Sequence, residues 1–212
     1  MRIEQLGPPD ADHSTGLILR WRDRLLFALE PRRNWRDREG TLLARFVGIG
    51  GHLEAGETWA QAVRREAREE ADLDVTLLSP ETTTLLLGDG TIQDISAALD
   101  WSIPPRPLFI WSAHFRFGRP PNEWERHFVN AVFLAAVPDE AEPRPAAEME
   151  AILAITGGQL CRAARQPVYL GTLLDGGATV WASIPIPRPT LVVPGGTAQW
   201  YATLLNHQAS NQ

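Results

Sequence analysis

The sequence predicts a mixed α/β fold (α/β or α+β), in which helices pack against a mixed β-sheet. Apolar runs of strand length, separated by glycine and proline turns, flank one strongly patterned helical segment. The order of strands, glycine-rich loop, helix and further strands is typical of a layered architecture. The chain has 212 residues, of which 44% are apolar, and this is enough to fill a sizeable core.

The first part of the chain is predicted to supply strands that lead into the glycine-rich loop. Residues 14–20 and 23–30 are predicted strands separated by a charged turn, and residues 42–46 lead into the loop. The polar stretch between them, residues 31–40, is predicted to be a solvated loop. An alternative interpretation is that its arginines meet substrate phosphates: Arg32, Arg33 and Arg36.

The helix is predicted to begin at Trp59 and to run to about Ala71. Thr58 lies three residues ahead of Gln61, which is the sequence form of a capping box. At 100° per residue, a narrow apolar arc is formed by Ala60, Ala67 and Ala71.

Three glutamates of this helix, Glu66, Glu69 and Glu70, cluster within about 100° of arc beside the apolar edge. Like charges at these spacings repel, at a cost of a few tenths of a kcal/mol per pair. The cluster is therefore either a solvated acidic face or a site for a divalent cation, which takes carboxylate oxygens and shares a substrate phosphate.

The loop in front of the helix favours the cation site. Its glycines permit unusual backbone angles and the close approach of a ligand: Gly48, Gly50, Gly51 and Gly56. A glycine loop that enters a helix N-terminus is also a plausible phosphate cradle. Joined to the glutamates at fixed spacing, the loop becomes a strong functional signal.

This spacing resembles the signature of the Nudix hydrolases, G-x5-E-x7-R-E-U-x-E-E-x-G-U, where U is aliphatic. The match comprises Gly51, then Glu57, then the run Arg65-Glu66-Ala67-Arg68-Glu69-Glu70-Ala71-Asp72-Leu73. Ala67 is smaller than the usual aliphatic residue, and Asp72 replaces the final glycine. The motif covers about 25 residues, and the flanking pattern extends the likeness to roughly residues 12–156.

The resemblance implies an α/β/α sandwich with its signature in a loop-helix-loop. We expect a Nudix domain over residues 1–156 with an insertion at about 75–107. Residues 157–212 would be a C-terminal extension packed on the same domain, long enough to serve a homodimer.

The resemblance also implies a hydrolase that cleaves a nucleoside diphosphate linked to another group, with Mg²⁺ or Mn²⁺ and an attacking water. Carried over by position, the metal ligands are Glu69 and Glu70, with Glu66 as ligand or general base and the carbonyl of Gly50 as a further ligand. The catalytic set is completed by three residues: Arg65 and Glu57, which orient the glutamates, and a further carboxylate, for which Glu148 is preferred over Glu150 and Glu142.

After the helix, strands are predicted at residues 74–78, 82–87, 108–117 and 127–137, with a turn at 88–90 and a short helix at 91–99. Further along, a helix is predicted at 157–166, strands at 168–174 and 178–184, an irregular segment at 185–194 and a final helix at 199–207. The aromatic residues Trp101, Trp111, Trp124 and Phe115 either pack in the core or stack on a nucleobase.

Composition excludes several function classes. All 20 basic residues are arginine, which rules out a Walker-type phosphate loop or a Schiff-base lysine. Cys161 is the only cysteine, so neither an intrachain disulfide nor a thiolate zinc cluster is formed, and a cytoplasmic setting is expected. The net charge of −6 argues against duplex nucleic acid as a partner. No secretory signal is recognised, and no apolar run approaches the roughly 20 residues of a membrane helix.

Two other functions compete with hydrolysis. One is a Nudix-fold module that binds a nucleotide without cleaving it. The other is an isomerase that uses the same site for proton transfer on an isoprenoid diphosphate. The intact set of glutamates favours catalysis over binding alone, because a pure binder has no chemical need for a crowded acidic face.

Overall fold

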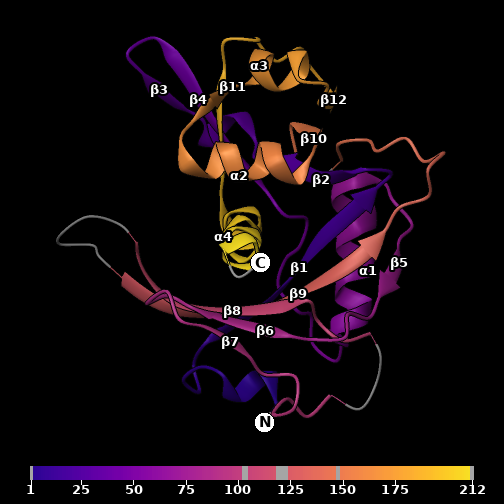
Figure 1. Cartoon of the computed structure of the whole chain (residues 1–212), viewed down its shortest axis with the longest axis vertical. Helices are drawn as coiled ribbons and strands as arrows, with labels where there is room; N and C mark the ends of the chain where they lie inside the picture. The colour runs from indigo at the N-terminus through magenta and orange to yellow at the C-terminus, as the bar shows by residue number, and fades with distance from the viewer. Residues whose placement is uncertain (1, 102–104, 118–123, 147–148, 211–212) are drawn as a thin grey trace.

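The computed structural model describes residues 2–101, 105–117, 124–146 and 149–210. In this part of the chain, 13 strands form one mixed sheet with the order β11-β13-β4-β2-β1-β9-β8-β6-β7, while β10 pairs with β2 and β12, β3 pairs with β4, and β5 pairs with β9 (Figure 1). The strands are β1 (Asp12–Trp21), β2 (Arg24–Leu29), β3 (Arg36–Arg38), β4 (Thr41–Val47), β5 (Thr76–Leu78), β6 (Thr84–Leu87), β7 (Ile92–Asp94), β8 (Phe109–Phe117), β9 (Trp124–Ala136), β10 (Ala151–Ile155), β11 (Val168–Tyr169), β12 (Thr179–Ala182) and β13 (Leu191–Pro194). The helices are α1 (Trp59–Ala71), α2 (Gly157–Arg165), α3 (Leu170–Asp175) and α4 (Gly196–Ser210), with 3₁₀ turns η1 (Ile3–Gln5) and η2 (Arg32–Asn34). None of the described helices is long and apolar enough to cross a membrane.

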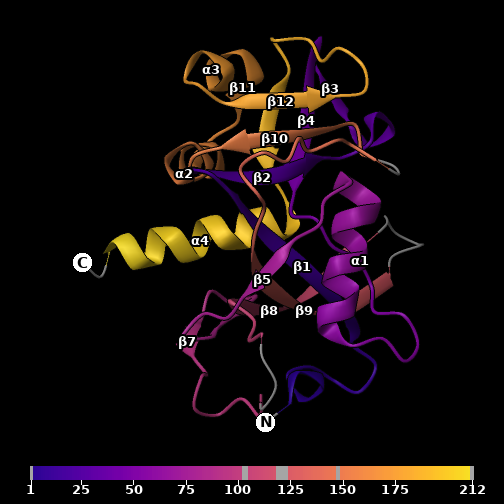
Figure 2. The same cartoon turned by 90° about the vertical axis from the view of Figure 1, so that its right-hand side faces the viewer.

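The two faces of the sheet carry separate apolar cores. Leu17 and Leu19 of β1 pack with Val63 of α1, whereas Ile18, between them, packs on the other face with Leu160 of α2 and Ala202 of α4. Successive residues of a strand point to opposite faces, so the part of β1 that lies between the two cores, Leu17 to Leu19, is apolar at every position. Figure 2 shows α1 and α4 on either side of the β1 and β9 pair. The predicted mixed α/β sandwich is therefore confirmed.

The helix α1 begins and ends as predicted. The side chain of Thr58 accepts a hydrogen bond from the backbone N–H of Gln61, and the side chain of Gln61 accepts one from the N–H of Thr58. At the other end, Asp72 is left-handed at φ 53° and ψ 42°. The capping box of Thr58 and Gln61 thus marks the start of the helix, and Asp72, which stands where the resembled signature has glycine, marks its end.

The polar stretch at residues 31–40 is only partly the solvated loop that was predicted. It contains η2 and the strand β3, which forms a hairpin with β4 in which Arg38 pairs with Thr41. Glu39 and Gly40 form the two-residue turn, at φ 53° and 82°. Positive φ at both central residues is the geometry that joins strands with the natural twist.

The helix predicted at residues 91–99 is wrong. Residues Ile92–Asp94 form β7, which adds an edge strand to β6. Ile95 and Leu99 do lie on one buried side, at 1% and 6% exposure, but a single turn suffices to place them there. The hydroxyl of Ser96, in contact with Asp94, accepts a hydrogen bond from the backbone N–H of Thr83 and ties that turn to the sheet.

Two predictions in the C-terminal segment also need correction. The strand predicted at 168–174 is β11 followed by α3, because Leu170 and Leu173 pack into the core at helical spacing. The segment predicted to be irregular, 185–194, ends in β13, which pairs in parallel with β4. The last residue of β13 is Pro194, opposite Phe46, so proline falls at the end of the strand.

The substitution Asp72→Gly is expected to raise the melting temperature by about 2–4 °C. The left-handed conformation costs a non-glycine residue roughly 1 kcal/mol, and an acid at a helix C-terminus opposes the helix dipole. Differential scanning calorimetry measures the shift. Metal affinity should not change, and a lowered melting temperature would show that Asp72 stabilises this helix end.

Candidate active site

The glycine loop between β4 and α1 is fastened to the edge of β1. The backbone N–H of Leu17 donates to the carbonyl of Ile49 at 2.7 Å, and the N–H of Thr15 donates to the carbonyl of Gly51 at 2.8 Å. Gly50, between these bonds, has φ 153°, and a Cβ on it would lie 2.1 Å from the carbonyl oxygen of Thr15. Only glycine lets the loop approach the strand this closely.

Gly51 makes room for the first glutamate of the helix. A Cβ on Gly51 would lie 2.3 Å from Oε1 of Glu66. Glu66 is 8% exposed, and burial raises the pKa of its carboxyl group, while Arg65 acts in the opposite direction. The carboxyl group of Glu66 is thus buried against the glycine loop.

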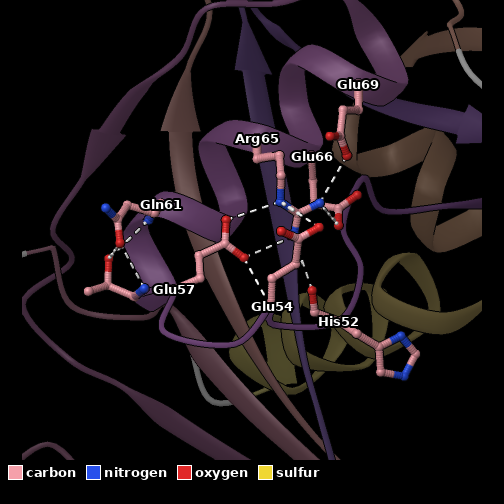
Figure 3. A network of polar contacts seen from close by, with 8 residues as sticks. His52, Glu54, Glu57, Gln61, Arg65, Glu66 and Glu69 are labelled. Carbon is pink, nitrogen blue, oxygen red and sulfur yellow. Dashed lines mark hydrogen bonds and ion pairs between the residues drawn. The ribbon is translucent and has the colours of Figure 1, made fainter.

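Arg65 connects the loop to the acidic face of α1, and Figure 3 shows three carboxylates directed at its guanidinium. Its Nε and Nη2 each donate to Glu57, both at 3.0 Å. Its Nη1 donates to Glu66 at 2.7 Å and to Glu69 at 2.9 Å. A further bond joins Nη2 to the carbonyl of His52 at 3.1 Å, so His52 contributes its backbone to the network.

The electrostatics of this network follow from the geometry. The paired bonds from Arg65 lower the pKa of Glu57, whereas the surrounding carboxylates raise the pKa of Arg65 itself. The arginine side chain is 22% exposed and that of Glu57 is 13% exposed. A bidentate, largely sheltered pair of this kind fixes the orientation of both partners.

Glu70 is tied to the loop by a different bond. The backbone N–H of Gly50 donates to Oε2 of Glu70 at 3.1 Å. The carbonyls of Glu70 and Ala71 accept from the N–H groups of Ala146 and Arg144, which fastens the chain that precedes β10 to the end of α1. The structure thus brings Glu57, Arg65, Glu66, Glu69, Glu70 and Gly50 together.

The chemistry of the donor set fits a hard divalent cation. The carboxylates of Glu66, Glu69 and Glu70 and the carbonyl of Gly50 are all oxygen ligands of the kind that Mg²⁺ and Mn²⁺ accept. In the described part of the chain, no three His, Cys, Asp or Glu side chains are arranged as a metal-binding group. In this arrangement, Arg65 donates a hydrogen bond to one carboxylate oxygen of Glu66 and to one of Glu69.

Three glutamates were candidates for the further carboxylate of the site. Glu148 lies outside the described residues. Glu150 faces Arg32, with 3.4 Å between Oε1 and Nε, and Arg32 also lies over the ring of Trp35. Glu142 is exposed.

The aromatic candidates are mostly structural. Trp111 is 7% exposed and stacks on Trp200 of α4 with 5.8 Å between ring centroids. Trp101 packs on Phe133, and its indole N–H donates to the carbonyl of Pro105. Phe115 is 37% exposed, and the side chain of Trp124 lies outside the described residues. Core packing accounts for Trp111 and Trp101.

The helix α4 supports the glycine loop, and no pattern in the sequence predicted this contact. Thr197, in the first turn of α4, lies so close to Gly48 that a Cβ there would be 2.7 Å from its side chain. A Cβ on Gly16 would lie 2.7 Å from the Thr197 hydroxyl and 3.2 Å from Oδ1 of Asn130. These contacts join residues far apart in the chain, so no local pattern could reveal them.

We expect Gly50→Ala to destabilise the protein by about 2–4 kcal/mol, because the new methyl group would overlap the backbone of Thr15. Gly56→Ala is the matched control. Gly56 also has a positive φ, 81°, but a Cβ there would meet nothing within 4 Å, so its cost is limited to about 1 kcal/mol of backbone strain. Urea unfolding measures both, and equal losses would contradict the close docking of the loop.

Glu57→Gln should lower stability more at pH 7 than at pH 3. The pKa of Glu57 is depressed in the folded protein, so its contribution is complete above the ordinary carboxylate pKa of 4.5 and is lost as the pH falls through the lower, folded value. The difference in melting temperature between wild type and variant should therefore shrink on acidification. A difference that is constant between pH 7 and pH 3 would show that the Arg65 and Glu57 pair is not ionic.

Comparison with known proteins finds a family model that matches part of the chain. Residues 14–94, which include the glycine loop and α1, match the model of the NUDIX domain family. No curated protein matches the chain.

Among solved structures, a NUDIX family hydrolase from Clostridium perfringens is 17% identical over 71% of this chain and 83% of its own, with a TM-score of 0.41. The dihydroneopterin triphosphate pyrophosphohydrolase of E. coli is 16% identical over 72% and 86%, with a TM-score of 0.41. A NUDIX hydrolase from Nitrosomonas europaea is 16% identical over 71% and 60%, with a TM-score of 0.40. With the family signature on the loop and helix, residues 14–94 of this chain are similar to the NUDIX domain.

Proposed function

We propose that this protein hydrolyses the pyrophosphate bond of a nucleoside diphosphate linked to another group, with Mg²⁺ or Mn²⁺ as cofactor and water as nucleophile. The observation that carries the proposal is the way four carboxylates of one segment are held against the glycine loop. Three of them bond to Arg65, and the fourth, Glu70, bonds to the N–H of Gly50. A face organised by so many bonds is not a loosely solvated acidic patch.

The charge of the site suits a cation that brings a polyphosphate with it. The cluster contains one arginine and four carboxylates, so Arg65 organises the acidic face without neutralising it. Glu69, Glu70 and the carbonyl of Gly50 would hold the cation, and Glu66 would be a further ligand or the general base. When bound, the cation supplies charge neutralisation for the pyrophosphate, a template for its oxygens and activation of water.

Glu57 and Arg65 act as positioning residues in this proposal. The fork of Arg65 is fixed on one side by Glu57 and on the other by Glu66 and Glu69. This geometry holds the helix carboxylates in defined rotamers before any ligand arrives, which reduces the reorganisation that catalysis would otherwise require.

Glu70→Gln should lower the turnover rate about 100-fold or more while leaving the protein folded, because a neutral amide of equal size replaces a charged ligand. Activity is measured with Mg²⁺ on nucleoside triphosphates, dinucleoside polyphosphates, nucleotide sugars, ADP-ribose and dinucleotide cofactors. Circular dichroism checks the fold.

Glu39→Gln is the matched control, because Glu39 is an exposed glutamate in the β3–β4 turn. It should retain full activity. Full activity in Glu70→Gln would remove this glutamate from the site, and the absence of products from the whole panel in the wild type would contradict hydrolysis.

A further inference from the structure

A second pocket lies where the β1–β2 turn meets α2 and α4, and its volume is about 310 Å³. Three arginines line it: Arg20 at the end of β1, Arg22 in the turn and Arg24 at the start of β2. Asp23 is the one acidic residue of its lining. The pocket is therefore positive in a chain whose net charge is −6.

The positive charge of the pocket is weakly compensated. Arg22 donates from Nε and Nη2 to the carbonyl of Asp139, a neutral acceptor, and lies over the ring of Trp21. Asp23 is 3.7 Å from Nε of Arg24, but its side chain is 76% exposed, so water screens the pair. For Arg20 and Arg22, the described residues contain no ion pair with a carboxylate.

Arg24 is the least exposed of the three arginines. Its side chain is 20% exposed, and its Nη1 is enclosed without a hydrogen-bond partner among the described residues. A guanidinium keeps its charge at any accessible pH, so it cannot escape the cost of burial by losing a proton. Nη1 itself is closed to solvent, so an anion in the pocket would meet the exposed part of the Arg24 side chain, which carries the same positive charge.

The rest of the lining indicates what kind of anion fits. Gly157 begins α2, whose N-terminus is the positive end of its dipole and favours a phosphate. Leu108, Leu134 and Leu205 form an apolar part of the wall. Burial raises the pKa of Tyr201, with Arg20 acting in the opposite direction, so its phenol stays protonated and can donate a hydrogen bond.

We propose that this pocket binds a small organic phosphate, with the phosphate group against Arg20, Arg24 and the start of α2 and an apolar group against the leucines. The site is separate from the glutamates of α1. Ser14, which bridges to His52 of the glycine loop, and Arg20 lie six residues apart on β1, which corresponds to about 20 Å. The pocket is therefore an accessory site, and its occupant lies away from the acidic face.

The test measures phenyl phosphate binding by isothermal titration calorimetry to full-length protein treated with a chelator. The chelator keeps the α1 glutamates free of cations, so binding reports on the second pocket. Phenyl phosphate should bind more tightly than inorganic phosphate, which lacks the apolar group, and the uncharged phenol should not bind. Arg24→Gln and Arg20→Gln should each weaken the affinity about 10-fold or more, and Arg20→Gln provides the test should Arg24→Gln fold poorly.

Arg36→Gln is the matched control, because Arg36 is an exposed arginine of β3 and does not line the pocket. It should leave the affinity unchanged. The proposal is overturned by unchanged affinity in Arg24→Gln and Arg20→Gln, by equal binding of phenol, or by no binding of phenyl phosphate at millimolar concentration. These outcomes are independent of turnover, so the hydrolase proposal stands or falls separately.

Discussion

One guanidinium group holds the acidic face of this protein in place. Arg65 donates to Glu57, Glu66 and Glu69 and to the carbonyl of His52, so it joins the loop to the helix. Without it, carboxylates spaced one helical turn apart would repel one another and turn towards water. A single positive charge orients the carboxylates and leaves the group anionic, which is the condition that binding of a divalent cation requires.

The parts of the fold that the sequence predicted are those in which local chemistry decides the structure. Thr58 and Gln61 cap α1 through their own side chains, and the left-handed Asp72 lies where the family pattern has glycine. The glutamates share one edge of that helix because the 3.6-residue period places them there. The candidate site was therefore accessible from a single segment of about 25 residues.

Other parts depend on partners that are distant in sequence. The pattern of residues 91–99 fits a helix, but β6 offers an edge on which Ile92–Asp94 pairs as a strand. Pairing with β4 likewise makes β13 a strand after a proline-rich segment. Thr197 against Gly48, and the arginine pocket between the β1–β2 turn, α2 and α4, also arise only when remote elements meet. No window of sequence contains those contacts.

The central claim is that the acidic face of α1, braced by Arg65 and by the N–H of Gly50, exists to hold a divalent cation beside the glycine loop. Anomalous diffraction from crystals soaked in Mn²⁺ tests it most directly. The account predicts a manganese peak within ligand distance of the Glu69 and Glu70 carboxylates. Crystals that show those carboxylates well ordered at saturating Mn²⁺, with no anomalous peak beside them, would contradict it.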